Sequence, residues 1–452
     1  MMPFFSFFGT RHLVLLITTA CLTSILSNMN TYNFTKICIS NDTSSTHNQN
    51  YTKHQQSMLQ SFVAWGTLVG GVPYVYLFSK YSHRYLFISA GIISAVSTAL
   101  IPLANQGGFG YFLVARVIQG VAFAATSPLI GALTATWAPL GEHGIFLALA
   151  TGFTQLANIF TMPVSGALCS SNWGWPAVYY VHAIVTAIVF TLFFFFYRNH
   201  PNIHPLVSPE ELKRIEANKN NEKKASDVPY FSIFTSLTIW AVWIAALGDL
   251  LSVQLVSLFN PQYMKDYLKY DILNTGFMAA LPVIVQFVVK CFSGAISDAL
   301  YCLNETTKVR IFNTFALGVS GLAFILLALM NNAHPSLNIV VLVFTESMIG
   351  FNTAGFNKCA TLHSRQYSHF VMTQIINIWA VCILVEPFIV NPILGDGSYV
   401  GWRNVFLLHA GILLATNVVF CFFADATPAK WTLQKEENDS ENFDEKRPPI
   451  EK

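Results

Sequence analysis

The sequence has few charged residues: 11% of its 452 residues are Asp, Glu, Lys or Arg, whereas 53% are hydrophobic. Soluble domains usually carry about a quarter of charged residues, so a soluble fold could not keep this much apolar surface from water. The net charge of +2 and the lack of a basic cluster beside aromatic residues argue against a nucleic-acid partner. These shortages favour a protein that crosses a lipid bilayer several times.

The sequence also lacks the motifs of soluble active sites. It contains no phosphate-binding glycine loop with lysine, no HExxH and no GxSxG, so we expect neither an ATP-driven pump nor an enzyme, and no cofactor. Its eight cysteines include no CxxC pair, so neither a metal site nor a disulfide framework is indicated. Cys38 and Cys169 could both lie on the non-cytoplasmic side, but a bond between them is the less favoured alternative.

Long apolar segments, by contrast, are abundant. A transmembrane helix needs about 20 predominantly apolar residues, and twelve segments meet this requirement. They lie at residues 12–32, 57–79, 86–105, 110–134, 144–168, 176–197, 232–258, 273–297, 309–330, 337–358, 369–394 and 402–424. The first segment follows Arg11 as a signal peptide would, but it lacks a small-x-small cleavage site and further spans follow directly. The sequence therefore predicts an all-α membrane protein with twelve transmembrane helices.

A polar stretch divides the twelve spans six and six. It covers residues 198–229 and is rich in Lys and Arg, so the positive-inside rule places it in the cytoplasm. Within it, SPEELKRIEANK predicts a short capped amphipathic helix. The expected domains are a six-helix bundle over residues 1–197, this cytoplasmic linker, a second six-helix bundle over 230–424 and a charged, disordered cytoplasmic tail over 425–452.

The glycosylation sequons agree with this orientation. Counting six spans from the linker in each direction places both termini in the cytoplasm and the loop between the first two spans outside. That loop carries sequons at Asn41 and Asn50, whereas a third, at Asn33, lies at the membrane edge. We therefore predict N-glycosylation at Asn41 and Asn50.

The two halves of the chain look like repeats of each other. Gly174-Trp175 opens the sixth span, and Gly401-Trp402 opens the twelfth. Two parallel six-helix repeats are typical of transporters that rock two halves about a central site. A channel or a receptor is less favoured by this duplication.

Several motifs resemble those of the major facilitator superfamily and, within it, of the anion/cation symporter family that includes the vesicular glutamate transporters, sialin and the type I sodium-phosphate cotransporters. The matching motifs are Arg116-x-x-Gln119-Gly120, Pro128, Trp137-Ala138-Pro139-x-x-Glu142, Pro163-x-x-Gly166, Gly174-Trp175, Ser297-Asp298 and Gly355-Phe356-Asn357. They are spread in order over nearly the whole chain. The resemblance implies the major facilitator fold and transport of a small anion, without indicating which anion.

Arg116 in the fourth span is the main candidate for contact with the substrate. A guanidinium cannot lose its proton in a protein, so burying it in hydrocarbon costs several kcal/mol unless water or an anion meets it. The resemblance implies that Arg116 attracts an anionic substrate. Two structural alternatives remain open, namely snorkelling to the membrane surface and pairing with another helix. Gln60, Gln119 and Asn357 are the other candidate substrate ligands.

Some family residues are missing. The relatives usually carry a glutamate seven residues after the arginine, where this chain has Phe123. The histidine in the second span of the glutamate transporters is replaced by Gln60, and their first-span arginine falls near Met29. The coupling route of these relatives therefore cannot be transferred, and glutamate cannot be assigned as the cargo.

The chain has buried acidic residues of its own. Asp249, Glu346 and Glu386 lie inside the seventh, tenth and eleventh spans. A carboxylate in hydrocarbon takes up a proton or meets a cation, as a proton- or sodium-coupling site requires. The structural alternative is buried pairing, of Glu346 with Arg116 or of Asp249 with Lys290. His182 in the sixth span could titrate near neutral pH, but a lone histidine among apolar residues more often fills the core as a hydrogen-bonded group.

Together these observations predict a secondary active transporter of small organic anions or phosphate, coupled to a proton or sodium gradient by alternating access. Two alternatives stay open. The first is a membrane sensor or scaffold that keeps the fold without transport, and the second is a facilitator of neutral or cationic solutes. Either the plasma membrane or an intracellular vesicle membrane fits the sequence.

Overall fold

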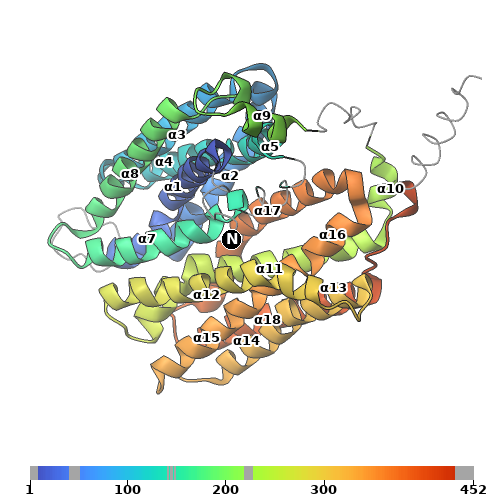
Figure 1. Ribbon diagram of the computed structural model, residues 1–452. Coiled ribbons are helices and arrows are strands. Elements are labelled where there is room, and N and C mark those ends of the chain that lie inside the picture. The colour runs from blue at the N-terminus through green and yellow to red at the C-terminus, as the bar shows by residue number, and fades with distance from the viewer. Residues whose placement is uncertain are drawn as a thin grey trace, which may run out of the picture.

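The computed structural model describes residues 9–39, 51–139, 142, 146, 149–217 and 228–432. These residues form helices and loops without any strand, as predicted. Two helix bundles face each other: α1 to α8 (blue to green) form one, and α11 to α18 (yellow to red) form the other (Figure 1). The predicted glycosylation sites Asn41 and Asn50 lie outside the described residues. Asn33, of the third sequon, is buried inside α1.

The helices have the following bounds. The N-terminal bundle comprises α1 (Thr10–Ile39), α2 (Lys53–Lys80), α3 (His83–Gly107), α4 (Phe109–Phe123), α5 (Thr126–Trp137), α7 (Phe153–Cys169) and α8 (Gly174–Phe196). The linker holds η3 (Pro201–Ile203) and α9 (Pro209–Glu216). The C-terminal part comprises α10 (Tyr230–Phe234), α11 (Leu237–Gln262), η5 (Tyr263–Tyr267), α12 (Ile272–Ala299), α13 (Glu305–Asn313), η6 (Thr314–Val319), α14 (Ser320–Leu329), α15 (Pro335–Ile349), η7 (Gly350–Thr353), α16 (Phe356–Ser364), η8 (Arg365–Tyr367), α17 (Ser368–Leu394) and α18 (Tyr399–Phe423).

Eleven helical stretches of the described chain are long and apolar enough to cross a membrane. They coincide with the predicted spans except the fifth, at 144–168, where α7 begins at Phe153 and the preceding residues are described only in part. Large apolar side chains such as Val72, Ile184 and Phe422 are exposed on the outer surfaces. Such surfaces suit lipid tails, which are as apolar as the side chains themselves.

The fourth span is broken near its middle. It consists of α4 and α5, and the chain turns at Ala124 and Ala125 between them. Pro128 lies four residues after Ala124, and a proline ring both lacks an N–H group and clashes with the carbonyl four residues before it. The break places Thr126 and Ser127 on the wall of the central cavity.

The two bundles pack together through three pairs of helices, α2 with α17, α7 with α12 and α1 with α11. Glycines allow the second pair to approach closely, because a Cβ atom on Gly166 would lie 2.9 Å from the Cα of Gly276. This end of the molecule, which also holds Cys38 and Cys169, is called the disulfide face below. The opposite end, where α8 leads into the linker, is called the linker face.

Cys38 and Cys169 form a disulfide bond. This corrects the sequence-based preference for leaving them unpaired. The two cysteines end α1 and α7, which pack side by side although 131 residues separate the cysteines in sequence. Cysteine spacing gives no sign of such helix adjacency, and for this reason the sequence leaves the pair as the less favoured alternative.

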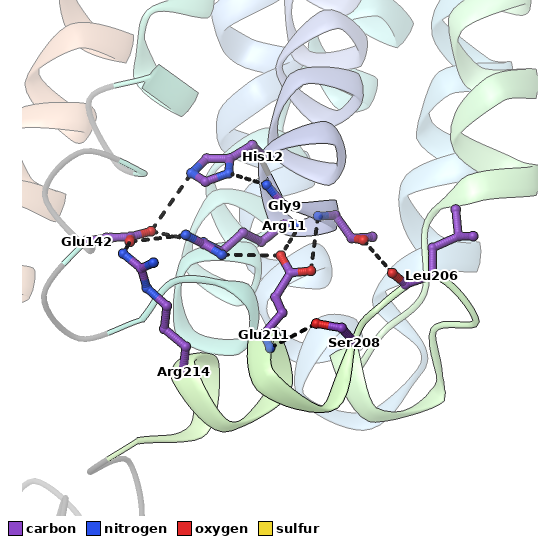
Figure 2. A network of polar contacts seen from close by, with 9 residues as sticks. Gly9, Arg11, His12, Glu142, Leu206, Ser208, Glu211 and Arg214 are labelled. Carbon is purple, nitrogen blue, oxygen red and sulfur yellow. Dashed lines mark hydrogen bonds and ion pairs between the residues drawn. The ribbon is translucent and has the colours of Figure 1, made fainter. Parts of the chain in front are cut away.

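The linker is anchored to the N-terminal bundle by an ionic network (Figure 2). The predicted amphipathic helix is α9, with Ser208 as its N-cap. Its Glu211 accepts hydrogen bonds from the backbone N–H of Arg11 and from the Arg11 guanidinium, at 3.0 and 3.3 Å. Arg11 also bonds Glu142 at 3.0 Å, and Arg214 of α9 bonds the same carboxylate at 2.5 Å. The start of α1, the segment after α5 and the linker helix are thus tied together at the linker face.

The start of the C-terminal tail is ordered, which corrects the prediction of disorder from Asp425 onward. Residues 425–432 pack against α13 and α16. The backbone N–H of Ala429 donates to the carbonyl of His363 at 3.0 Å, and Thr306 donates to Asp425 at 3.2 Å. The ring of Trp431 packs against that of Tyr367 at a tilted angle, with ring centres 5.7 Å apart. The prediction of disorder is based on the charged composition of the whole tail, in which a single apolar contact such as that of Trp431 has little weight. Residues 433–452 lie outside the described chain.

Removing the disulfide should destabilise the folded protein. We expect the double variant Cys38→Ser, Cys169→Ser to lose about 2–4 kcal/mol of stability, because the bond closes a long loop in the unfolded chain. Thermal unfolding in detergent measures this as a lower midpoint than in wild type. Cys291→Ser, which removes an exposed free cysteine, is the matched control and should unfold like wild type. Maleimide labelling of Cys38 in unreduced, denatured wild-type protein would contradict the bond.

The linker anchor should weaken in acid. Burial raises the pKa of Glu142, but the hydrogen bond and charge of Arg11, with Arg214, outweigh this and hold it below the ordinary 4.5. The stabilisation is therefore complete above the ordinary pKa and is lost as pH falls through the lowered one. Glu142→Gln should cost about 1–3 kcal/mol at neutral pH and remove this acid dependence of thermal unfolding. Glu216→Gln on the exposed side of α9 should change neither; an unchanged acid profile in Glu142→Gln would refute the anchor.

Candidate functional site

A central cavity of about 250 Å³ lies between the two bundles. The N-terminal bundle contributes lining residues from α1, α2, α4, α5 and α7, and the C-terminal bundle contributes them from α11, α12, α15, η7, α16 and α17. Five of the predicted site residues line it, namely Gln60, Arg116, Asp249, Glu346 and Asn357, and so does Lys290. Gln119 and Glu386 are not among the lining residues.

Arg116 is held by oxygen atoms that carry no full charge. Its Nε donates to the carbonyl of Leu59 at 2.8 Å, and its Nη1 donates to the carbonyl of Met29 at 2.8 Å and to Oε1 of Gln119 at 2.7 Å. Its guanidinium also lies 5.3 Å from the ring centre of Tyr32. No carboxylate pairs with it within the described part of the chain, so the alternative of a Glu346–Arg116 pair is not what the structure shows.

One edge of the Arg116 guanidinium is left for a ligand. A guanidinium has five N–H donors, and the three hydrogen bonds above use Nε and Nη1. Among the described residues none accepts a hydrogen bond from Nη2, and Arg116 lines the cavity although its side chain is 1% exposed. The arrangement combines a permanent positive charge, an unused pair of donors and a water-sized space. Such a group can bind a carboxylate or a phosphate.

Gln119 positions Arg116. Its Oε1 accepts from the guanidinium, and its Nε2 donates to the carbonyl of Asn28 at 3.1 Å and to the hydroxyl of Thr98 at 2.8 Å. The side chain is 1% exposed and lies behind Arg116 as seen from the cavity. In this conformation Gln119 therefore fixes the arginine and does not face the cavity.

The amides of Gln60 and Asn357 do line the cavity, from opposite bundles. Gln60 accepts a long hydrogen bond of 3.4 Å from Asn391, while its buried Nε2 has no partner. Asn357 donates to the carbonyl of Asn352 at 3.3 Å. Both have hydrogen-bonding capacity left for a polar solute.

The titratable acids of the cavity belong to the C-terminal bundle. Asp249 of α11 accepts a hydrogen bond of 3.0 Å from Asn352, and its other carboxylate oxygen has no partner. Glu346 of α15 also has an unpartnered oxygen, and both side chains are 1% exposed. The two carboxyl groups are near enough to interact electrostatically, as are Asp249 and Lys290. A direct ion pair of Asp249 with Lys290, the predicted alternative, is not formed between these described residues.

Glu386 has a different setting from the other two acids. It lies on α17 and contacts Nε2 of His409 on α18 at 2.8 Å, with both residues 1% exposed or less. His409 is not among the site residues predicted from the sequence. The repeat could have revealed it, because His409 follows Gly401 by the same eight residues that separate His182 from Gly174.

The cavity is closed at the disulfide face by polar contacts between the bundles. Asn158 of α7 accepts a hydrogen bond of 2.8 Å from Asn30 of its own bundle and donates across to Ser257 of α11 at 3.3 Å. Ser57 of α2 donates to the carbonyl of Pro387 on α17 at 2.9 Å. From the level of Arg116 the lining continues toward the linker face, along α5, α7, α16 and the first half of α17.

Two facing helix bundles around a charged cavity that is closed at one end define a multi-pass membrane transporter. The family model of the Major Facilitator Superfamily matches residues 4–385, so the chain belongs to this superfamily. The predicted resemblance and the predicted twelve-helix fold are thereby confirmed.

Individual relatives agree with this assignment. The chain is 26% identical to sialin of Homo sapiens over 397 residues, which cover 86% of this chain and 80% of sialin. It is 23% identical to vesicular glutamate transporter 2 of Homo sapiens over 397 residues, covering 86% of this chain and 68% of that protein.

Solved structures show the same fold. A bacterial homologue of the human lysosomal transporter Spinster, in an inward-facing and occupied conformation, aligns with a TM-score of 0.67 at 13% identity, over 91% of this chain and 96% of that chain. A D-xylose-proton symporter aligns with a TM-score of 0.67 at 13% identity, over 91% and 98% of the two chains.

Proposed function

We propose that this protein is a secondary active transporter of a small organic anion or phosphate, driven by a proton or sodium gradient. The observation that carries the proposal is the Arg116 guanidinium, which faces the central cavity without an acidic partner. The relatives named as a vesicular glutamate transporter and as a proton symporter support anion cargo and cation coupling, respectively.

The proposed orientation has the linker face in the cytoplasm, with both termini. The Lys- and Arg-rich linker favours the cytoplasm. The opposite face carries the Cys38–Cys169 disulfide, and such bonds persist in oxidising compartments outside the cytosol. That face points to the lumen if the protein resides in a vesicle and to the exterior if it resides in the plasma membrane. The structure then corresponds to a state closed to that side, with its cavity extending toward the cytoplasm.

Coupling follows from the distribution of charge in the cavity. The N-terminal bundle supplies the fixed positive charge of Arg116, and the C-terminal bundle supplies Asp249 and Glu346 with Lys290. When both acids are ionised, they oppose an anion in the same cavity. A proton or a sodium ion bound at these carboxylates removes that opposition, so cation and anion bind more tightly together than singly. The bound cation and the bound anion then both stabilise the fully loaded protein, and this is the form that switches between the two sides of the membrane.

The open alternatives have distinct consequences. A sensor or scaffold would bind an anion without moving it across the membrane. A facilitator of neutral or cationic solutes would be indifferent to the charge at Arg116. The unpaired charge of Arg116 favours an anionic ligand over a neutral or cationic one, and transport across the membrane separates a transporter from a sensor.

Removing the Arg116 charge should abolish transport. In proteoliposomes supplied with L-glutamate, inorganic phosphate or other small organic anions, we expect Arg116→Ala to reduce uptake of the transported anion at least 100-fold, because the charged donor pair is lost. Arg116→Lys keeps the charge without the planar donor edge and should lose most of the uptake. Arg403→Ala, an arginine on α18 outside the cavity lining, is the control and should transport normally. Wild-type uptake by correctly folded Arg116→Ala would refute the substrate role.

Neutralising the cavity acids should uncouple transport from the driving ion. We expect Asp249→Asn and Glu346→Gln each to reduce gradient-driven accumulation about tenfold or more, while anion exchange without a gradient continues. Imposing proton and sodium gradients separately identifies the coupling ion in wild type. Asp396→Asn changes an exposed acid on a loop and should leave accumulation intact. Full accumulation by the Asp249→Asn, Glu346→Gln double variant would remove both residues from coupling.

A further inference from the structure

Glu386 and His409 form a buried pair outside the cavity lining. Their contact between Oε1 and Nε2 is 2.8 Å long, and neither side chain is more than 1% exposed. The second carboxylate oxygen of Glu386 has no hydrogen-bond partner. The pair joins α17 to α18 in the interior of the C-terminal bundle.

The hydrogen bonds of His409 determine how many protons this pair holds. Its Nδ1 lies 2.8 Å from the carbonyl of Val405, and a carbonyl only accepts, so Nδ1 carries a hydrogen. In a neutral ring Nε2 is then an acceptor, and an ionised carboxylate is an acceptor too. A contact of 2.8 Å between them needs one hydrogen, carried either by Glu386 as the acid or by His409 as imidazolium.

Only the state with one shared proton is free of net charge. Loss of the proton would leave a buried negative charge and two acceptors facing each other. A second proton would leave a buried positive charge. Both changes are expensive where water is excluded, so the pair keeps its single proton while it stays buried.

The other repeat shows what the carboxyl group adds. His182 occupies the equivalent position on α8, and its Nδ1 lies 2.7 Å from the carbonyl of Val178. Its Nε2 has no partner, and the ring packs edge-on against Phe160. The two histidines therefore share a backbone contact, but only His409 has an acid with which to share a proton.

Few titratable groups lie near the pair on the described helices that pack against α17 and α18. On α17 the nearest is Cys382, which interacts electrostatically with both Glu386 and Asp249 of α11. Helices α14 and η6 carry no titratable side chain. On α2, the ring of His54 contacts that of Phe388, one residue beyond Pro387, at a tilted angle. The cations and histidine of α13 and α16 bond partners at the linker face: Lys308, Arg310, Lys358 and His363.

The pair lies directly behind the contact that closes the disulfide face. The carbonyl of Pro387, the residue after Glu386, accepts a hydrogen bond of 2.9 Å from Ser57 on α2. Asn391, one turn further along α17, donates to the same Ser57 at 2.8 Å. Because α2 and α17 belong to opposite bundles, these bonds must break when the transporter opens at the disulfide face. Breaking them removes the contact that covers the chain next to Glu386.

We propose that Glu386 and His409 are a single-proton binding site that exchanges its proton with the solution at the disulfide face when α2 and α17 separate. The site rests on the proposed alternating access, and it deepens that function by assigning it a proton switch. In the open state a high pH on this side removes the proton. The charged pair then opposes burial, so closure slows by up to tenfold per pH unit, the limit for one proton.

Infrared difference spectroscopy on substrate-free protein tests the site without any assumption about cargo. We expect a pH step to change the Glu386 carboxyl band and the His409 ring band together, and Glu386→Gln or His409→Gln to remove both changes. His182→Gln is the matched control and should leave both bands intact. Bands that titrate independently, or that persist in Glu386→Gln, would overturn the shared proton.

A locked gate tests the route of exchange. The variant Ser57→Cys, Asn391→Cys joins α2 to α17 when oxidised, and we expect the coupled bands to stop responding to pH until a reductant opens the lock. An unchanged response in the locked protein would overturn exchange through this gate. These measurements use folded wild-type sites, so they decide the proposal even if Glu386→Gln fails to fold.

Sided transport assays connect the site with function. With L-glutamate and inorganic phosphate as probes, the rate of anion exchange by the wild-type protein should fall as pH rises at the disulfide face. Glu386→Gln and His409→Gln should lose this pH dependence, whereas His182→Gln should keep it. Retained dependence in both pair variants would overturn the switch. If wild type exchanges neither probe nor any other anion, the proposed function fails, and the infrared result still decides the proton site.

Discussion

A guanidinium inside a membrane needs oxygen ligands, and much of the N-terminal bundle is arranged to supply them for Arg116. The carbonyls of Leu59 and Met29 bring α2 and α1 against α4, and Gln119 adds a side-chain acceptor. These groups solvate the charge without neutralising it, because none of them is ionised. A carboxylate in the place of these oxygen atoms would have formed an ion pair with Arg116 and neutralised its charge. Because the ligands of Arg116 are neutral carbonyl and amide groups, a net positive charge remains at the cavity wall, where an anion can supply the missing hydrogen-bond acceptors.

The two bundles therefore have different electrostatic roles. The N-terminal bundle holds the permanent charge of Arg116, whereas the C-terminal bundle holds the carboxyl groups of Asp249 and Glu346 and the Glu386–His409 pair. Such a division suits alternating access, since movement of one bundle against the other changes how strongly a bound anion senses the acids. The proton-sharing pair is separate from the cavity and lies instead behind the gate contact of Ser57 with Pro387.

The two faces restrain this movement differently. At the disulfide face, the Cys38–Cys169 bond lies within one bundle, so the contacts between bundles there are hydrogen bonds and van der Waals packing that can break. At the linker face, Glu211 of the linker helix pairs with Arg11 and Arg214 of the same helix pairs with Glu142, which fastens this helix to the N-terminal bundle. The linker helix therefore belongs to the N-terminal bundle.

The sequence by itself determined the spans, the two repeats, the linker helix and the identity of most charged residues in the cavity. These features depend on local composition and on bilayer thickness, which act on each segment separately. Only the tertiary structure decided which polar groups meet. It joined Cys38 to Cys169, turned Gln119 behind Arg116, moved Glu386 out of the cavity toward His409 and left Arg116 without an acid. Such contacts depend on how helices that are distant in the chain rotate and pack against each other. Hydrophobic periodicity does not specify this rotation or packing when every face of a helix is apolar.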